Sequence, residues 1–360
     1  MWLFIEPVDV WLFRDGRPFD AGADHAARSI FPPWPGTLQG ALRSKVLALF
    51  DVDLAAYQNG VAPAPVRKQI GVPNQPGDLR ISGPFVARRA GDQLIPYFPC
   101  PMDLIKRADW GLLKPQAMAS LANWPVPALR PLGTEAEADL AGKGDGVTYW
   151  LDGAGLTQYL AGQTPDPKHF VAEGCLWLRE GRFGVGIDSA VQRPEEGLLY
   201  QAEYLRLSDG VGLLAEVIGL DETPWAQAGL LSLGGEMRAA RYSVVSRPTS
   251  WPASALGETR ASGLKIYLAT PVYFRDGWQS RAWAVDASEL KLVAAAVPRA
   301  VSAGGWDMAR NRPKPTRRYV PAGSVYYFEN PAQAWEPPVS LGDDASEDQM
   351  GFGCYFTGRW

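Results

Sequence analysis

The chain has 360 residues, of which 46% are hydrophobic and 21% charged, a composition typical of a soluble globular protein long enough for two domains. Its 38 glycines and 31 prolines favour turns and shaped loops over a helical bundle. The formal net charge of −4 counts against a freestanding nucleic-acid binder, which is usually basic, but allows a local basic groove inside a larger assembly.

The cysteines and the N-terminal residues bear on the compartment. Cys100, Cys175 and Cys354 are far apart and form no C-x-x-C motif, so we expect buried structural thiols in a reducing cytoplasm, with no metal site, cofactor or disulfide framework. The N-terminus opens into a strand that contains Glu6 and Asp9, which is not the pattern of a signal peptide. No apolar run reaches the ~18 residues of a membrane span, so we expect a cytoplasmic protein.

The first 50 residues carry the clearest structural pattern. Trp2–Phe13 is an apolar, β-rich stretch that ends in an Asp15-Gly16 turn. The proline-rich Phe31–Gly36 predicts a stiff, extended connection, and Thr37 is the expected N-cap of a helix. Apolar residues follow at helical spacing, namely Leu38, Ala41, Leu42, Val46 and Leu49.

The remaining chain reads mainly as strands and loops. Residues 51–80 are expected to be irregular, and 99–131 to be an ordered excursion broken by prolines. Strands are predicted at Leu79–Val86, Gln93–Phe98, Phe170–Leu178, Phe183–Ile187, Gly197–Leu207, Val211–Leu220, Tyr242–Val245, Leu264–Phe274, Val301–Ala303, Tyr319–Pro321 and Ser324–Phe328. Leu156–Ala161 is a short helix, Leu290–Val297 is strand or helix, and Arg179–Arg182 separates two strands. The domain change is placed near Ser208–Gly210.

One segment is echoed later in the chain. Val10–Gly16 and Pro271–Gly277 are both aromatic strands that end in Arg-Asp-Gly. Two related α+β domains would explain the echo, and so would coincidence, because Asp-Gly turns are common. The residues alone leave both explanations open.

Catalytic motifs are absent from the sequence. There are only two histidines, His25 and His169, and no nucleophile elbow, zinc-protease motif or P-loop. Asp343–Asp348 contains four carboxylates, but a solvated acidic loop is favoured over a two-metal site, because no apolar residues surround them to hold the geometry.

Three basic clusters are candidates for phosphate binding, which needs several cations on one face and accessible N–H groups. The first consists of Arg14, Arg17, His25 and Arg28 in one loop, with Arg43 and Lys45 on the adjoining helix. We expect Arg43 and Lys45 to point away from the apolar stripe of that helix. Taken alone, an ordinary solvated surface neutralised by neighbouring aspartates is the better interpretation of this cluster.

The second cluster is the segment Gly304–Arg318. It carries five cations against the single acid Asp307, and prolines on both sides of Lys314 stiffen it. Trp306 is placed to stack on a base, and a binding role is favoured over a charged loop. Its candidate contacts are Trp306, Arg310, Arg312, Lys314 and Arg317.

The third cluster combines a glycine turn with two arginines. Gly234 and Gly235 form the expected turn, and Arg238 and Arg241 follow it. A plain hairpin with exposed arginines explains this pattern equally well.

Together these residues resemble a known family. The segments that carry the resemblance are Phe4-Ile-Glu-Pro, Phe13-Arg-Asp-Gly-Arg-Pro-Phe, Asp24-His-Ala-Ala-Arg-Ser-Ile-Phe-Pro-Pro, Thr37-Leu-Gln-Gly-Ala-Leu-Arg-Ser, Gly234-Gly-Glu with Arg238-Ala-Ala-Arg-Tyr, Gly304-Gly-Trp-Asp-Met-Ala, Arg312-Pro-Lys-Pro-Thr-Arg-Arg, Pro321-Ala-Gly-Ser-Val-Tyr and Gly351-Phe-Gly. They resemble, in the same order, the RAMP subunit that caps the crRNA 5′ end in type III-B (Cmr) CRISPR effector complexes. Residues 99–170 match nothing in that family.

The resemblance implies an α+β fold of two ferredoxin-like (RRM-like) RAMP domains with long inserted loops. The first would span residues 1–208, with an insertion around 99–168, and the second residues 209–360. The implied function is a non-catalytic subunit that holds the repeat-derived 5′ handle of crRNA with the three clusters above. Its implied partners are the large polymerase/cyclase-like subunit and the adjacent backbone RAMP subunit.

Two alternatives stay open at this point. The chain could be a RAMP endoribonuclease that processes CRISPR RNA with His25 as general base. It could also be a purely structural adaptor whose basic loops meet acidic partner surfaces.

Overall fold

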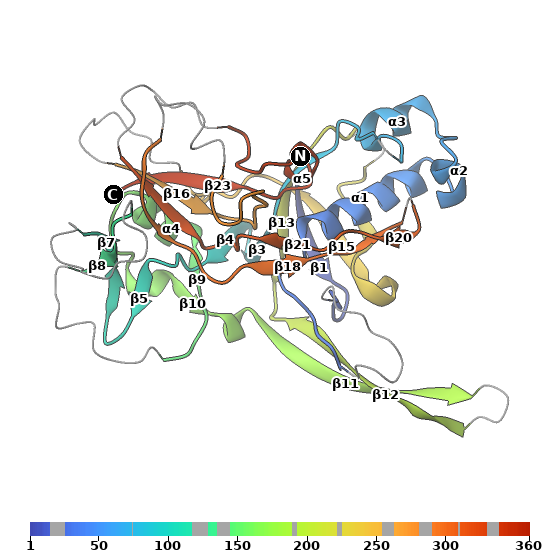
Figure 1. The fold of residues 1–360 in the computed structure, drawn as a ribbon. Helices are drawn as coiled ribbons and strands as arrows, with labels where there is room; N and C mark the ends of the chain where they lie inside the picture. The colour runs from blue at the N-terminus through green and yellow to red at the C-terminus, as the bar shows by residue number, and fades with distance from the viewer. Residues whose placement is uncertain are drawn as a thin grey trace. The chain divides into compact units, whose positions relative to one another are not determined.

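The computed structural model describes residues 1–14, 26–73, 75–116, 129–134, 145–188, 193–221, 225–253, 263–280, 290–308, 310–329 and 338–360. These residues form a mixed α/β fold that is rich in strands and has few helices (Figure 1). Two compact units are each built from separated stretches of chain. Unit 1 comprises Met1–Arg88, Gly174–Ser246 and Ser302–Arg317, and unit 2 comprises Arg89–Glu173, Arg247–Val301 and Arg318–Trp360.

Unit 1 consists of an antiparallel sheet, three helices and a long hairpin. Its strands are β1 (Trp2–Pro7), β2 (Ala26–Ala27), β3 (Arg80–Ala90), β11 (Trp177–Asp188), β12 (Arg193–Leu207), β13 (Val211–Ile218), β14 (Ala228–Ser232), β15 (Ala239–Val245), β19 (Trp306–Asp307) and β20 (Arg312–Pro313). Its helices are α1 (Pro35–Leu49), α2 (Leu54–Gln58), α3 (Ala64–Ile70) and the 3-10 turn η4 (Gly235–Met237).

The N-terminal strand lies in the middle of the unit 1 sheet, whose strand order is β3-β13-β1-β15-β14. Phe4 pairs with Leu214 of β13 on one side and with Ser243 of β15 on the other. Leu3, Phe4 and Ile5 are all fully buried, so both faces of β1 are covered, although successive side chains point to opposite faces. The first residues of the chain therefore belong to the core of unit 1. The segment after Pro7 begins at a position that the sheet fixes.

Helix α1 confirms the predicted apolar stripe but begins earlier than predicted. Leu38, Leu42 and Val46 are fully buried. The N-cap is Trp34 and not Thr37, and Pro35 occupies the first turn. Proline is suited to that position because its missing N–H would have no partner there. Residues 51–80, predicted to be irregular, contain α2 and α3.

The predicted break at Arg179–Arg182 is wrong. Strand β11 runs through it and pairs with β12 from Trp177↔Leu207 to Asp188↔Arg193. Figure 1 shows the resulting β11–β12 hairpin as a two-stranded arm that extends from unit 1. Charge and a glycine made this stretch resemble a turn, whereas the charges form ion pairs within the hairpin, such as Glu180 with Arg206.

The chain near the predicted domain change at Ser208 is a tight turn inside unit 1. Val211 N donates to Ser208 O at 2.9 Å, and the turn joins β12 to β13, which both belong to unit 1. The echoed segments lie in different units, Val10–Phe13 in unit 1 and Pro271–Gly277 in unit 2.

Unit 2 is also mainly strands. Its elements are β4 (Gln93–Pro99), β5 (Leu104–Lys106), β6 (Trp110–Leu112), β7 (Lys114–Pro115), β8 (Leu132–Gly133), β9 (Tyr149–Asp152), α4 (Gly153–Leu160), η2 (Pro167–His169), β10 (Phe170–Ala172), β16 (Leu264–Leu268), β17 (Leu292–Ala296), β22 (Val325–Phe328), α5 (Ala345–Asp348) and β23 (Tyr355–Arg359). η3 (Glu173–Cys175), β18 (Val301–Ala303), β21 (Arg317–Tyr319) and the last two residues of β3 fall at the sequence joins between the two units. The strand orders within unit 2 are β10-β9-β4 and β17-β22-β16-β23.

Strand β16 separates an apolar core from a buried polar cluster. Leu264, Ile266 and Leu268 belong to the hydrophobic core of unit 2, while the fully buried Lys265 lies on the opposite face of the strand. Lys265 Nζ donates to Tyr159 O at 2.9 Å. The buried Asp103 accepts hydrogen bonds from Tyr159 OH at 2.7 Å and from Tyr327 OH.

Burial sets the protonation behaviour of this cluster. It lowers the pKa of the Lys265 ammonium to about 8, while Asp103 acts in the opposite direction. Burial also raises the pKa of the Asp103 carboxyl, although Lys265 and the two tyrosine hydroxyls act to lower it. A lysine whose folded pKa lies below its unfolded value costs stability at low pH, and the cost shrinks as pH rises from the folded pKa towards the unfolded one.

We predict that the stability of Lys265→Met, measured relative to the wild type, is greater at low pH than at high pH. Unfolding free energies of both proteins are measured by urea titration at pH 7, 8 and 9.5. Between pH 8 and 9.5 the wild type should gain about 1–2 kcal/mol relative to the variant, because the unfolded lysine still holds the proton that the folded one has lost. A difference between the two proteins that does not change with pH would contradict a buried Lys265.

No described helix is long and apolar enough to cross a membrane.

Candidate nucleic-acid interface

The described candidate residues all lie in stretches that belong to unit 1. Arg17 and His25 lie outside the described residues. The others are Arg14, Arg28, Arg43, Lys45, Gly234, Gly235, Arg238, Arg241, Trp306, Arg310, Arg312, Lys314 and Arg317. Residues far apart in the sequence are therefore collected in one unit, and several of them form the two local groups described below.

The first group begins where the chain leaves β1. Trp11 pairs with Leu205 of β12 through two backbone hydrogen bonds of 2.8 and 3.0 Å. Arg14 forms an antiparallel bridge with Ser29, and β2 runs parallel to β12, with Ala26 opposite Gln201. Both flanks of residues 15–25 are thus attached to each other and to the hairpin, and the exposed Arg14 and Arg28 lie at this point.

Ser29 is the centre of a small hydrogen-bond network. Its backbone N–H donates to Glu203 Oε1 at 3.2 Å, and its hydroxyl donates to Glu203 O. Arg179 donates to Ser29 O and to Glu203 Oε1, each at 2.6 Å. Ser29 is buried, so this network satisfies polar groups that would otherwise be costly, and it fixes the position of the neighbouring Arg28 backbone.

The glycine turn packs directly on the chain after β1. Gly235 N donates to Leu12 O at 2.7 Å. Gly234 has φ +97°, and a Cβ at this position would lie 2.8 Å from Leu12 O and 3.1 Å from the Phe13 ring. Only glycine combines this backbone conformation with so close an approach. The predicted turn is therefore confirmed. Its glycines allow the backbone to pack closely on Leu12 and Phe13, whereas we had expected them to leave N–H groups accessible to a ligand.

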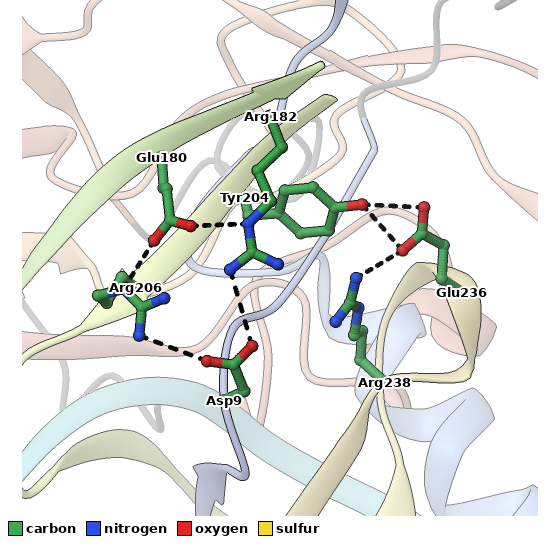
Figure 2. Close-up of polar contacts among 7 residues, drawn as sticks. All are labelled: Asp9, Glu180, Arg182, Tyr204, Arg206, Glu236 and Arg238. Atoms are coloured by element: carbon green, nitrogen blue, oxygen red, sulfur yellow. Dashed lines mark hydrogen bonds and ion pairs between the residues drawn. The ribbon is translucent and has the colours of Figure 1, made fainter. Parts of the chain in front are cut away.

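Charged residues at the base of the hairpin are paired with one another (Figure 2). Arg182 and Arg206 both donate to Glu180 at 2.7 Å and both lie within 3.7 Å of Asp9. These arginines lower the pKa of the Glu180 carboxyl, Arg206 most strongly. The base of the hairpin is thus an ionic network and not a strongly basic surface.

Tyr204 extends this network to the glycine turn. Its ring lies 4.9 Å from the Arg182 guanidinium and 4.8 Å from that of Arg238, and its hydroxyl donates to the Glu236 carboxylate at 2.9 Å (Figure 2). Arg238 donates to Glu236 at 2.7 Å, which raises the pKa of its guanidinium. Arg238 therefore already has an anionic partner within the chain.

The second group consists of the β19–β20 ribbon and the helices beside it. Trp306 pairs with Pro313 and Asp307 with Arg312, and Lys314 N donates to Gly305 O at 2.8 Å. Arg310 forms an ion pair with Asp307 at 3.0 Å. The ribbon is tied to α2 by Gln58 Nε2, which donates to Met308 O at 2.6 Å.

The prediction that Arg43 and Lys45 point away from the apolar stripe of α1 did not anticipate their burial. Both are half-buried. Desolvation lowers the pKa of Arg43, while Tyr57 and Asp307 act in the opposite direction, which places Arg43 between α2 and the β19–β20 ribbon. Lys45 Nζ lies 6.0 Å from the centre of the Tyr242 ring. Each side chain fills a gap next to the apolar stripe, because a long basic side chain can bury its methylene groups.

Arg241 lies on a different face from Lys45. Tyr242 is buried and Arg241 is exposed, as alternation along β15 requires. Lys45 lies near the Tyr242 ring, on the face of the sheet that α1 covers. These two predicted contacts therefore do not belong to one surface, and Arg241 lies on the open face of the sheet together with the exposed Leu230 of β14, its cross-strand partner.

The second histidine and the cysteines have structural environments. His169 is buried and contacts Asp152 at 3.0 Å and Gln158 at 3.3 Å. Burial raises the pKa of the half-buried Cys100 to about 12. Cys175 is exposed, so the expectation of three buried thiols is wrong for this residue. The described residues contain no group of three or more metal-ligating side chains.

Comparison with known proteins identifies the family. The model of the family described as "CRISPR-associated protein (Cas_Cmr3)" matches residues 3–360. The chain belongs to the Cas_Cmr3 family. This confirms the resemblance to the type III-B (Cmr) RAMP subunit and makes the chain a component of a type III CRISPR effector complex. None of the curated proteins compared with it matches significantly.

One solved structure shares the fold, and two others show a weaker similarity. A chain in the cryo-EM structure of the Type III-B Cmr-beta bound to cognate target RNA and AMPPnP is 14% identical, with a TM-score of 0.51 over 91% of this chain and 86% of that one. A chain from Cmr-beta bound to cognate target RNA is 16% identical, with a TM-score of 0.48 over 91% and 86%. A chain of the Csm3-Csm4 subcomplex of the type III-A CRISPR-Cas interference complex is 10% identical, with a TM-score of 0.41 over 92% and 95%.

The hairpin side of the candidate interface was not predicted from the sequence. Arg179, Arg182 and Tyr204 hold the flanks of residues 15–25 and the glycine turn in place. A signal was present in the mixed charges of Arg179-Glu-Gly-Arg182, because Arg179 and Glu180 form diagonal cross-strand ion pairs with Glu203 and Arg206.

We predict that Gly234→Ala destabilises unit 1 by about 1–3 kcal/mol, because alanine is strained at this φ and its methyl group meets Leu12 O. The free energy of unfolding measured in urea checks this. Gly174→Ala is the control, because a Cβ there meets no atom within 4 Å. Equal stability of the two variants would show that the Gly234 turn does not pack on Leu12.

Proposed function

We propose that this Cas_Cmr3 protein holds the repeat-derived 5′ handle of crRNA with unit 1. The observation that carries the proposal is the gathering in unit 1 of cations and glycines from separate stretches of the chain, namely the flanks of residues 15–25, the Gly234 turn and the β19–β20 ribbon. Sequence-distant cations on one scaffold provide the sequence-independent contacts to phosphates that RNA binding needs.

The β19–β20 ribbon supports RNA contact most directly. Trp306 is 56% exposed and Arg312 is exposed on the paired strand. An exposed indole offers a surface on which a base can stack. Arg312, whose cross-strand partner is Asp307, offers a guanidinium to a phosphate on the other face of the ribbon. Because Gln58 ties this ribbon to α2, the two side chains are presented from a supported position.

The proposal includes the partners and the domain type that the family suggests. Each unit is a ferredoxin-like RAMP domain in this account. Other faces of the protein dock on the large polymerase/cyclase-like subunit and on the adjacent backbone RAMP subunit. The protein is non-catalytic, and His25 contacts RNA as a recognition residue. The net charge of −4 fits a chain that contacts RNA through a few exposed cations and meets proteins with other parts of its surface.

We predict that the double variant Arg312→Ala and Lys314→Ala weakens protection of the crRNA handle. In the purified complex, nuclease footprinting should show loss of protection, and the slope of log affinity against log salt should fall by about 0.7 for each phosphate contact removed.

The matched control is Arg67→Ala with Lys68→Ala, which removes two exposed cations of α3 in the same unit. It should leave protection and the salt slope unchanged. Equal behaviour of the two double variants would rule out the β19–β20 ribbon as a handle contact.

A separate prediction distinguishes RNA holding from RNA cleavage. The purified chain, incubated with CRISPR repeat RNA without divalent metal, should leave the RNA intact. In the complex, His25→Ala should weaken handle binding. Cleavage by the wild-type chain that His25→Ala abolishes would instead make this protein a ribonuclease with His25 as general base.

A further inference from the structure

Met237 is an apolar side chain presented to solvent at the tip of the turn between β14 and β15. It is the last residue of η4 and is 83% exposed. Its neighbours along the turn and the following strand are Glu236, Arg238 and, on the same face as Ala239, the exposed Arg241. Because this large apolar side chain is exposed to water, it contributes little hydrophobic stabilisation to unit 1.

The backbone that carries Met237 is strained. Glu236 has φ +56° and Met237 has φ +50°. Two consecutive residues with a Cβ therefore occupy the left-handed region, where glycine would be less costly. Such a conformation persists only where the surroundings hold it, and it is typical of functional positions.

The surroundings that hold it belong to the interface already described. Tyr204 OH donates to both oxygens of the Glu236 carboxylate at 2.9 Å, and Arg238 binds the same carboxylate at 2.7 Å (Figure 2). On the other side of the turn, Leu233 N donates to Arg238 O at 2.8 Å. The tip is thus supported by contacts on Glu236 and on the backbone, while Met237 itself is presented outwards.

The chemistry of the tip fits single-stranded RNA. Apolar side chains such as Met insert beside or between bases when cations next to them bind the flanking phosphates. Arg241 is exposed on the open face of β15, whereas Arg238 is occupied by Glu236. Arg241, whose cross-strand partners are Leu230 and Glu6, is the more exposed of the two arginines and is therefore the one suited to a phosphate, and Met237 is the group suited to a base.

We infer that Met237 packs against one unstacked base of the crRNA handle and that Arg241 binds an adjacent phosphate. The inference rests on the proposed function, since it assigns the handle to this site. It adds a base-contacting residue that does not carry charge. The strained turn keeps Met237 in position, so the contact forms without ordering a flexible loop.

The test uses the reconstituted effector complex with crRNA that carries 2-aminopurine at one handle position at a time. A packed base has altered fluorescence in the wild-type complex, and Met237→Ala should restore the signal of free RNA at one position. Affinity should fall roughly threefold to tenfold, as for a modest apolar base contact, with an unchanged salt slope. Arg241→Ala should instead lower the salt slope by about 0.7.

A second variant separates this role from a structural one. Met237→Gly relieves the left-handed strain, so its melting temperature should be equal to or higher than that of the wild type, while the base contact is lost. Met102→Ala is the matched control, because Met102 is 45% exposed and lies in unit 2. It should change neither fluorescence nor affinity.

Three outcomes would overturn the inference. Unchanged fluorescence and affinity in both Met237 variants, with the handle still protected, would refute the Met237 contact and leave the proposed function intact. Loss of a co-purifying protein subunit from the Met237→Ala complex, without any change in fluorescence, would make the tip a protein contact. An unprotected handle in the wild-type complex would refute both the contact and the proposed function.

Discussion

The hydrogen bonds around Ser29 are the constraint on which the candidate interface depends. Arg179 and Glu203 on the hairpin bind the backbone and hydroxyl of Ser29, and Ser29 bridges back to Arg14. Because Trp11 pairs with Leu205, the chain that follows β1 is held against the hairpin just before it enters this network. The network therefore fixes the backbone on both sides of residues 15–25, where cations lie, although neither side belongs to a long helix or strand.

Charge pairing explains how an acidic protein can contain an RNA site. Arg182, Arg206 and Arg238 each have a carboxylate partner within unit 1, so they organise the interface and add little net charge. Exposed cations such as Arg241 and Arg312 remain for phosphates. Under the proposed function, RNA affinity comes from a few well-placed contacts, and it should be sensitive to their geometry as well as to salt.

The parts of the fold and site that could be predicted from sequence are those with local signals. The buried β1, the α1 stripe and the glycine turn followed from periodicity and from Gly-Gly. The hairpin did not, because Arg179–Arg182 is polar like a turn and becomes a strand only through partners more than 20 residues away, Glu203 and Arg206. The surroundings of Arg43 were equally unpredictable, since the charge of Asp307, which acts on its guanidinium, comes from a distant stretch. The family could be recognised because its motifs are short and keep their order.

The most direct test of the central claim is ultraviolet crosslinking of the assembled complex, followed by mass spectrometry of peptides that carry handle nucleotides. The account predicts adducts in three stretches of unit 1, namely around residues 14–31, 234–241 and 304–317, and none in the stretches of unit 2. RNA adducts confined to unit 2, or a complex that contains crRNA yet gives only protein adducts from this chain, would contradict it.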